Sequence, residues 1–366
     1  MIGAICERLN TVGSRPPGSA LTGGVVLGID QDPAAKVTQI LFDEQGVARV
    51  VAKVARRRGA EEALRAEHGA LQDLLRDPPA GVCDTIPEPL LLEEIEGRLV
   101  LATTALPGGP MSVDYYRPGH AGQPRLVSRD FALAGDWLAR FQRETWRGQL
   151  VIGRETFEEF VLPVFERYRA SVGWSPWEQD LLDDLARGCA DLSGVTVPLV
   201  AVHGDYALGN ILLADERVTG VVDWELGRPL GLPFTDLFKF VSSYGSFLDR
   251  AIPPRGGTLP GHDGWAASAS RWGGAGTWPN RVGLLHAFFG SGWFPDLVRA
   301  FVRDHLRRLG APPEAVAVFL PLFLAGQAMA LENPVYRTGY RSVLEGLWQD
   351  RDRVARESAD GLEWAR

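Results

Sequence analysis

The chain has few cysteines and lacks any uncharged apolar run long enough to cross a membrane. Its three cysteines, Cys6, Cys83 and Cys189, lie far apart and form no C-x-x-C pair. Scattered cysteines in an odd number argue against a disulfide framework and are typical of thiols in a reducing compartment. The most apolar stretch, residues 315–331, is interrupted by Pro321, so we expect a buried core helix there. We therefore expect a cytoplasmic protein with no membrane partner.

The chain also lacks an excess of positive charge. Its net charge is −8, and neither residues 1–106 nor the remainder has more basic than acidic side chains. Domains that bind nucleic acid carry a basic excess, so we expect no nucleic-acid partner. Hydrophobic residues make up 45% and charged residues 23%, which is typical of a globular chain. We find no internal repeat, and the oligomeric state is unknown from the sequence.

Lysine is the scarcest charged residue. Only three of the 38 basic side chains are lysines: Lys36, Lys53 and Lys239. Lys53 stands inside the apolar run 48–55, where strand alternation places Val50, Ala52 and Val54 on one face and Lys53 on the other. Two interpretations are open. Lys53 is either on the solvated face of a sheet or is a compact ammonium group held against phosphates.

Short apolar runs with a period of two predict five strands in the first hundred residues. These runs are separated by turn residues and cover 25–29, 36–42, 48–55, 90–96 and 98–105. Between the third and fourth runs, apolar residues recur at helical spacing over residues 59–76. Short connections between strands predict an antiparallel sheet. The helix offers Glu61, Glu62 and Glu67 as acidic partners for Lys53.

A Gly- and Pro-rich stretch, residues 105–124, interrupts this pattern. We therefore place one domain at 1–106 and a second at 107–366. Helical spacing dominates the second domain, so an α+β fold is expected. The candidate helices cover 127–145, 155–171, 176–192, 233–248, 296–309, 313–332 and 338–356. Residues 245–295 are the exception, because they are rich in Gly, Pro and Trp, and we expect a long irregular segment there.

Three polar residues stand at the ends of short apolar runs in VHGDYALGNILLADERVTGVVDWE, residues 202–225. Asp205 follows the first run, Asn210 opens the second and Asp223 closes the third, which returns after a turn expected at Asp215–Glu216. Three short strands that converge can bring such residues into one small volume. An amide and a carboxylate oxygen suit Mg²⁺, and a second carboxylate suits work on a hydroxyl proton. Each residue alone is explained by capping a turn or helix, but the spacing of all three favours the chemical interpretation.

The segment HGDYALGNILL followed by VVDWE resembles the catalytic and metal-binding motifs of the aminoglycoside phosphotransferase and choline kinase family, which has the protein-kinase fold. Upstream, the order of three strands, a lysine in the third, a helix with Glu and two more strands resembles the N-lobe of that family. The resemblance implies a protein-kinase-like bilobal fold, with a five-stranded antiparallel N-lobe that carries one helix and a mainly helical C-lobe. The nucleotide would bind to the N-lobe, and the C-lobe would carry the catalytic loop.

By this resemblance the chain would be a small-molecule kinase that transfers the γ-phosphoryl group of ATP, or of GTP, to a hydroxyl group. Asp205 would be the catalytic base, and Asn210 and Asp223 would hold Mg²⁺. Lys53 would contact the phosphates, paired with Glu67 or, as the alternative, with Glu62. The further residues expected to bind the nucleotide lie in the hinge and the phosphate lid: Thr104, Leu106 and Lys36.

The sequence also departs from the family pattern. No G-x-G-x-x-G precedes the Lys53 strand, so the lid would use main-chain amides of residues 30–36, with Gly23–Gly24 as the alternative. Tyr206 stands where the family often has Asp or Asn, which bears on the acceptor side of the pocket. His203 resembles a family histidine that braces the catalytic loop. Asp236 resembles an aspartate that supports the site, although an ordinary helix cap explains it equally well.

The acceptor is expected to meet residues 245–295. Polycationic aminoglycosides call for several carboxylates, but this stretch has only Asp249 and Asp263. Its tryptophans suit sugars, macrolides or other partly apolar rings. They are Trp265, Trp272, Trp278 and Trp293. We therefore favour a neutral hydroxylated acceptor such as a sugar, an antibiotic or a related natural product.

Three alternatives stay open. Choline or ethanolamine is one, because aromatic faces also bind quaternary ammonium groups. A catalytically inactive nucleotide-binding pseudokinase or scaffold is another, although such proteins usually lose the lysine, the catalytic aspartate or the metal aspartate. A metal-dependent hydrolase is the third, but no further histidines stand at metal-ligand spacing.

Overall fold

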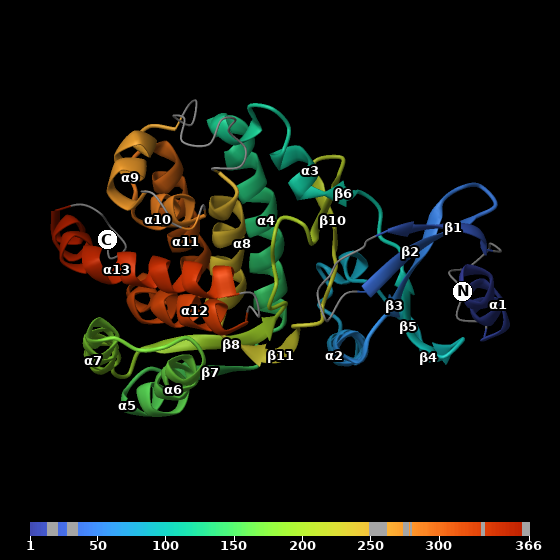
Figure 1. Ribbon diagram of the computed structural model, residues 1–366, viewed down its shortest axis with the longest axis horizontal. Coiled ribbons are helices and arrows are strands. Elements are labelled where there is room, and N and C mark those ends of the chain that lie inside the picture. Colours follow the sequence, from blue (N-terminus) through green and yellow to red (C-terminus); the bar gives the residue numbers. More distant parts are fainter. Residues whose placement is uncertain are drawn as a thin grey trace. The chain divides into compact units, whose positions relative to one another are not determined.

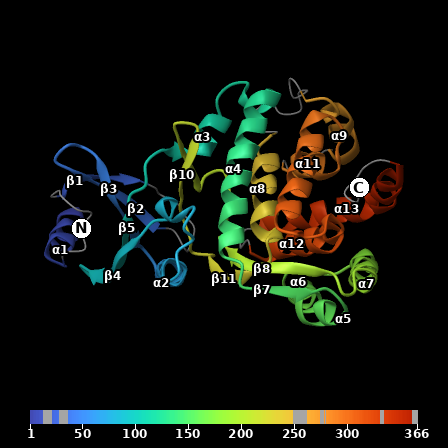
Figure 2. The same cartoon turned by 180° about the vertical axis from the view of Figure 1, so that it is seen from behind.

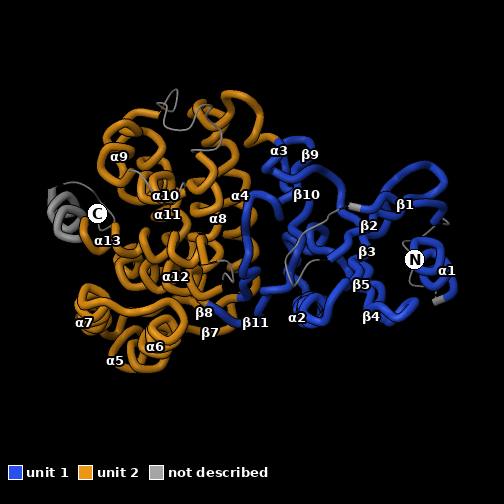
Figure 3. Tube along the Cα trace, in the orientation of Figure 1, with its two compact units in different colours: residues 1–113, 201–231 blue, residues 114–200, 232–366 orange. Residues whose placement is uncertain are grey.

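The computed structural model describes residues 1–12, 21–27, 36–248, 262–273, 278, 280–330 and 334–360, with side chains up to residue 350. The chain forms two compact units (Figure 3). Unit 1 comprises Met1–Val113 and Ala201–Gly231, and unit 2 comprises Asp114–Val200 and Leu232–Arg366. This division differs from two consecutive domains that meet at residue 106, because the segment with the catalytic motifs groups with the N-terminal sheet.

Unit 1 is built on the predicted five-stranded antiparallel sheet (Figure 1). The strands are β1 (Leu21–Leu27), β2 (Lys36–Asp43), β3 (Ala48–Ala55), β4 (Pro89–Ile95) and β5 (Arg98–Thr104). Their order in the sheet is β1-β2-β3-β5-β4. All five were predicted from the period-two runs. The first begins earlier than predicted, and Gly23 and Gly24 pair with β2 inside this strand instead of forming a lid turn.

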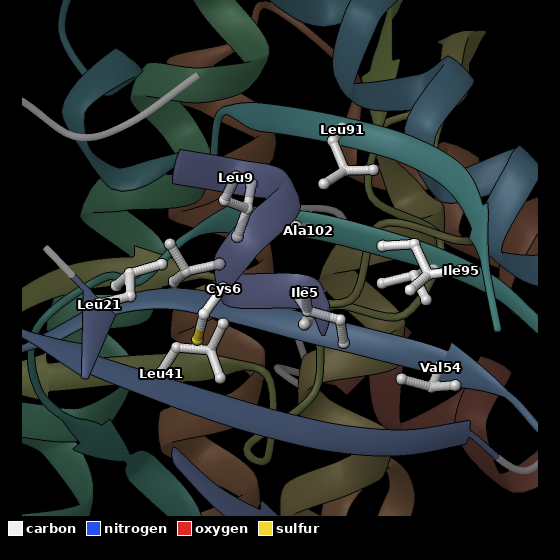
Figure 4. Close-up of a cluster of buried hydrophobic side chains, with 12 residues drawn as sticks. Ile5, Cys6, Leu9, Leu21, Leu41, Val54, Leu91, Ile95 and Ala102 are labelled. Carbon is white, nitrogen blue, oxygen red and sulfur yellow. The ribbon is translucent and has the colours of Figure 1, made fainter. Parts of the chain in front are cut away.

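A helix that was not predicted, α1 (Ile2–Val12), covers one face of this sheet. Its residues Ile5, Cys6 and Leu9 are buried in a core cluster with side chains from every strand of the sheet (Figure 4). The strand members of this cluster are Leu21, Leu41, Val50, Ala52, Val54, Leu91, Ile95, Val100 and Ala102. The alternation in β3 is therefore confirmed, because its apolar face packs against α1.

Helix α2 (Arg58–Leu75) covers the opposite face. Ala60 and Leu64 are buried there against Leu99 and Leu101 of β5. This smaller cluster occupies the N-terminal part of the helix. Farther along the helix, Glu67 is also buried, and a buried carboxylate requires a partner. That partner is the ammonium group of Lys53.

A short hairpin in unit 1 follows the predicted catalytic loop, residues 203–210, which we call the catalytic loop. Strands β9 (Ile211–Ala214) and β10 (Arg217–Val221) are antiparallel and form a three-stranded sheet with β6 (Gly109–Pro110). Asp215 and Glu216, which connect them, both have positive φ values of 49° and 55°. This is the backbone of a tight two-residue hairpin turn, which the sequence predicted at this position. Strand β8 (Thr196–Val202) leads into the catalytic loop, and β11 (Arg228–Gly231) ends the unit.

Unit 2 is mainly helical, as predicted. Its longer helices are α4 (Pro124–Glu144), α6 (Leu162–Ser171), α7 (Pro176–Asp191), α8 (Phe234–Ser246), α11 (Trp293–Arg308), α12 (Val316–Ala330) and α13 (Pro334–Asp360). The shorter elements are α3 (Met111–Tyr115), which begins in unit 1, α5 (Arg154–Thr156), α9 (Trp265–Trp272), α10 (Arg281–Phe289) and strand β7 (Gly148–Val151).

Helices α4, α8 and α11 lie side by side in unit 2 (Figures 1 and 2). Phe131 of α4 meets Phe240 of α8 and Phe301 of α11 with ring centroids 5.1 and 5.0 Å apart. Both contacts are edge-to-face, the arrangement that aromatic rings prefer. The three helices therefore share an aromatic core.

One segment of the described residues, Pro313–Ala330, is long and apolar enough to cross a membrane by length and composition alone. It is 18 residues long, and 56% of it is buried inside the molecule. Phe319 in this segment stacks on Phe234 of α8, with ring centroids 4.6 Å apart. The packing is that of a core helix, as predicted from Pro321.

The prediction of an irregular segment over 245–295 is wrong for the described part, which holds α9, α10 and the start of α11. Trp265 and Trp272, at the two ends of α9, are only 2% and 4% exposed. Trp272 Nε1 donates to Asp350 Oδ2 at 2.8 Å, and Trp265 meets the His286 ring edge-on. Both rings are therefore core residues. Residues 249–261, including Asp249, lie outside the described part.

Candidate active site

The β9–β10 hairpin explains why Asn210 and Asp223 are separated by twelve residues in the chain. Val221 pairs with Ile211, and the ladder continues for one more step because Val222 N donates to Asn210 O at 2.9 Å. Asn210 directly precedes β9, and Asp223 follows two residues after β10 ends. The tight turn therefore returns the chain so that both predicted metal ligands lie at the same end of the hairpin.

The side chain of Asn210 ties this end of the hairpin to the catalytic loop. Its Nδ2 donates to both the main-chain O and the Oδ2 of Asp205, at 2.9 Å each. The main chain is also closed locally, because Asn210 N donates to Ala207 O. With the amide nitrogen committed to Asp205, the amide oxygen of Asn210 faces away from that carboxylate. This is the atom that a hard metal ion requires.

His203 braces the loop from beneath. Its ring is fully buried, its Nδ1 accepts from Asp205 N at 3.2 Å, and its Nε2 lies 3.0 Å from Val222 O. Because Nδ1 is the acceptor, the proton is on Nε2, which donates to the carbonyl. Burial lowers the pKa of His203 to about 4, so the ring is neutral at physiological pH. His203 thus joins the catalytic loop to the residue before Asp223.

Lys53 lies between two carboxylates. Its Nζ is 2.6 and 2.7 Å from the two carboxylate oxygens of Glu67 and 2.8 Å from Asp223 Oδ1. Burial would lower the pKa of Lys53, but the charges of Glu67 and Asp223 outweigh it and raise the pKa above its usual value. The structure therefore pairs Lys53 with Glu67, while Glu62 is exposed on the same helix.

Lys36 approaches Asp223 from the neighbouring strand. Its Nζ lies 3.4 Å from Asp223 Oδ1 and forms a close ion pair with Glu225 Oε2. Burial would raise the pKa of Asp223, but Lys53 and Lys36 outweigh it and hold the pKa well below its usual range. Asp223 is therefore a stable anion. Glu225 was not among the site residues predicted from the sequence, although it lies only two residues after Asp223 in VVDWE.

Two residues of this region, Asp223 and Gly204, have left-handed backbone conformations. Asp223 has φ of 72°, which is uncommon for a residue other than glycine and is best tolerated by Asn and Asp. Gly204 has φ of 81°, and a Cβ added there would lie 2.5 Å from Leu226 O. The glycine of the His-Gly-Asp motif is therefore needed, because the catalytic loop passes directly over the segment that carries Asp223.

The structure describes only part of the predicted hinge and phosphate lid. Thr104 N donates to Glu88 O, and Thr104 Oγ1 accepts from Glu88 N, each at 2.9 Å. Thr104 is thus held by the residue before β4, and the next position, Ala105, donates its main-chain N–H to Arg49 O. Leu106 packs over Gly220 of β10. Contacts of Thr104 or Leu106 with a nucleotide stay predictions, and lid residues 30–35 lie outside the described part.

Two further predicted residues are placed by the structure. Tyr206 is completely buried, with its ring centroid 6.4 Å from that of His203. Asp236 is buried in the first turn of α8, in unit 2.

The donor set fits Mg²⁺. It consists of the Asp223 carboxylate and the Asn210 amide oxygen, both hard oxygen ligands. Within the described residues, no group of three His, Cys, Asp or Glu side chains forms a metal cage. Magnesium is commonly bound in just this way, by one or two carboxylates together with substrate phosphates.

The fold and the enclosed lysine–carboxylate set define a phosphotransferase of the protein-kinase-like type. The chain belongs to the phosphotransferase enzyme family, whose model matches residues 36–269. The resemblance seen in the sequence is thereby confirmed, and the enzyme class is one that acts on hydroxyl groups. A search of curated protein sequences found no match.

Solved structures support the fold. The chain is 14% identical to a thermostable mutant of aminoglycoside phosphotransferase APH(4)-Ia in its apo form, covering 98% of this chain and 99% of that one, with a TM-score of 0.51. The ternary complex of such a mutant with ADP and hygromycin B gives 13% identity, 97% coverage of both chains and a TM-score of 0.52. Macrolide 2′-phosphotransferase MphH from Brachybacterium faecium is 18% identical, over 94% of this chain and 98% of that chain, with a TM-score of 0.46.

Proposed function

We propose that this protein transfers the γ-phosphoryl group of ATP or GTP to a hydroxyl of a sugar, an antibiotic or a related natural product. The observation that carries the proposal is the position of Lys53 Nζ, within 2.8 Å of both Glu67 and Asp223. A charged lysine held between two carboxylates in this way is the arrangement that kinases of this fold need for catalysis. A protein that had lost turnover would have no reason to keep it intact.

The residues of unit 1 divide the work. Lys53 would bind the α and β phosphates as a compact positive charge, and Glu67 would keep it in place. Asp205, oriented by Asn210, would accept the proton of the acceptor hydroxyl as the new O–P bond forms. Asn210 and Asp223 would hold Mg²⁺, which when bound neutralises charge that develops on the phosphate oxygens. His203 would keep these residues in register and take no part in proton transfer.

A transfer assay tests this function. Purified protein is incubated with Mg²⁺, with ATP or GTP, and with a panel of hygromycin B, a macrolide, simple sugars and choline, and the phosphorylated product is detected by mass spectrometry. We expect turnover with a hydroxylated acceptor, and a loss of roughly 10²–10⁴-fold in Asp205→Asn. Nucleotide binding without transfer to any acceptor would favour the pseudokinase alternative. Transfer to choline alone would identify the choline kinase alternative.

Asp223 gives a second test. Asp223→Ala removes the only carboxylate proposed to ligate Mg²⁺, so the rate should fall by roughly a thousandfold or more, which corresponds to several kcal/mol of barrier. The measurement is the single-turnover rate at saturating nucleotide, with circular dichroism to show that the variant is folded. A folded variant that keeps the wild-type rate would contradict the metal assignment.

Two of the four tryptophans no longer indicate the acceptor. Because Trp265 and Trp272 are core residues, the preference for a neutral acceptor now rests on the partly exposed Trp278 and Trp293 and on the small number of acidic residues. The acceptor panel above therefore includes both polycationic and neutral compounds.

A further inference from the structure

The Asp223 carboxylate is shared by two lysines that differ in how firmly they are held. Lys53 contacts both oxygens of Glu67, whose side chain is 2% exposed, so this ammonium is fixed from two sides. Lys36 is the first residue of β2, lies 3.4 Å from Asp223 Oδ1, and has its closer partner in Glu225, which is 27% exposed. Lys36 is therefore the lysine that is able to change partners.

Both lysines lie on one face of the sheet. Thr38 is directly opposite Lys53 in the β2–β3 ladder, and Lys36 is two residues from Thr38 on the same side of its strand. The helix on this face, α2, supplies only Glu67 to the pair. A flexible four-carbon stem at the start of a strand lets the Lys36 ammonium move without moving the sheet.

The charges of these side chains determine which form of a divalent cation can bind at Asp223. Asp223 contacts both ammonium groups, while Lys53 is also paired with Glu67 and Lys36 with Glu225. A free divalent cation at Asp223 would face both positive charges, because Glu225 holds the Lys36 ammonium beside Asp223. A divalent cation bound to a nucleoside triphosphate arrives as a net anion. Its phosphate oxygens would replace the carboxylates as partners of Lys36, which would leave Asp223 free to ligate the metal.

We propose that the Lys36–Glu225 ion pair makes the Asp223 site selective for a divalent cation that arrives bound to nucleotide, and that it rejects the free cation. Lys36 is thus a specificity-determining residue, and Glu225 is the residue that holds it in the rejecting position. This inference rests on the proposed function, because it takes Asp223 as the metal ligand and nucleotide phosphate as the exchange partner of Lys36.

The test measures metal binding without turnover. Mn²⁺ replaces Mg²⁺, and its free concentration is read by electron paramagnetic resonance as the protein is titrated, first alone and then with the non-hydrolysable nucleotide AMP-PNP. We expect wild type to bind Mn²⁺ weakly without nucleotide, and Lys36→Met to bind it roughly tenfold more tightly or better, because one repelling charge is gone. With AMP-PNP, Lys36→Met should bind Mn²⁺ no more tightly than wild type.

Three control variants make the test specific. Lys36→Arg keeps the charge and should behave as wild type. Lys239→Met removes the same charge from unit 2, where Lys239 bonds to Gln327, and should leave Mn²⁺ binding unchanged. The double variant Lys36→Met/Asp223→Ala should lose the tightened site, which places the ion at Asp223. Thermal melting checks that each variant is folded.

The outcomes separate this inference from the proposed function. The inference is overturned if Lys36→Met binds free Mn²⁺ no more tightly than wild type does. It is also overturned if Lys239→Met gains as much affinity for Mn²⁺ as Lys36→Met. Neither result affects the proposed kinase activity. Failure of wild type to bind Mn²⁺ together with AMP-PNP overturns the proposed function itself. The proposed selectivity is supported if the affinity for Mn²⁺ rises in Lys36→Met, stays unchanged in the other single variants, and is lost again in the double variant.

Discussion

At the scale of single residues, the site depends on one lysine that contacts two carboxylates. The Lys53 strand and the Glu67 helix are consecutive in the chain, whereas Asp223 comes from a distant hairpin. A buried charge costs several kcal/mol unless it is paired, and a buried pair costs about as much when one partner is removed. Lys53 and Asp223 therefore hold each other in the ionised form, whereas burial and the charge of Asp223 raise the pKa of Glu67 and only the lysines oppose that rise.

Two of the three glutamates of α2, Glu67 and Glu62, provide a matched comparison. Glu67→Gln should raise the KM for nucleotide and lower the turnover number by about tenfold or more, because Lys53 loses its positioning partner. Glu62→Gln, an exposed change on the same helix, should leave both constants unchanged. Lys53→Met should be more damaging than Glu67→Gln, since it removes the phosphate contact itself.

Steady-state kinetics at varied nucleotide concentration gives the KM and the turnover number for these three variants. Wild-type constants in Glu67→Gln would show that the ion pair is structural only. Restoration of activity in Glu67→Asp, which keeps the charge, would support a positioning role.

Sequence patterns were sufficient to predict which face of a single strand or helix carries a given side chain. Alternation placed Lys53 opposite the core face, and helical spacing selected Glu67 over Glu62. Glu225 was missed because a glutamate after a strand is ordinary at a surface, and its contact with Lys36 depends on the fold. The hairpin geometry that unites Asn210 and Asp223 followed from the turn at Asp215–Glu216.

At the scale of elements, α1 was the main omission. Ile2, Ile5, Cys6 and Leu9 are spaced as one face of a helix, but an eleven-residue segment is too short to be recognised by its own stability. Its helical state comes from the sheet, because the apolar face of β3 and its neighbours has to be covered. Helix α9 was missed for a similar reason, since its partners lie in α10 and α13.

Helix α9 is attached to α13 through one buried carboxylate. Asp350 accepts from Arg271 Nε at 3.0 Å and from Trp272 Nε1 at 2.8 Å, and also pairs with the Arg271 Nη2 group. Asp350→Ala leaves the indole N–H and the guanidinium without this acceptor. We expect the free energy of unfolding to fall by about 2–4 kcal/mol.

Asp304→Ala is the control for this change. Asp304 forms an exposed ion pair with Arg307 on α11, so its loss should cost less than about 1 kcal/mol. Chemical denaturation of both variants gives the two free energies. Equal stabilities would contradict the importance of the Asp350 contacts.

At the scale of the whole molecule, buried histidines should determine the response to acid. Burial lowers the pKa of five of the six histidines, and the effect is large for four of them, to about 4 for His203 and His262 and to about 3 for His286 and His305. In the unfolded chain each would titrate near 6.5. Between these values the unfolded state binds more protons, so falling pH favours unfolding.

The stability of the protein should therefore be constant above pH 6.5 and decline from there toward pH 4. Each buried histidine lowers the free energy of unfolding by about 1.4 kcal/mol per pH unit in this range. Denaturant unfolding at several pH values measures the slope. In proton NMR the four ring resonances should keep their neutral positions down to pH 5, and titration near pH 6.5 would contradict the burial argument.

Unit 1 is discontinuous, and this affects how the site is made during synthesis. The sheet, α1 and α2 are complete by residue 113, but β9, β10 and Asp223 emerge from the ribosome only after residues 114–200. At roughly 5–20 residues per second, the delay is on the order of ten seconds. During that time a nascent chain has the lysine and its helix partner but neither the predicted catalytic loop nor Asp223, the carboxylate proposed to ligate the metal. Premature termination before residue 201 would therefore release a chain with the sheet in place and no means of phosphoryl transfer.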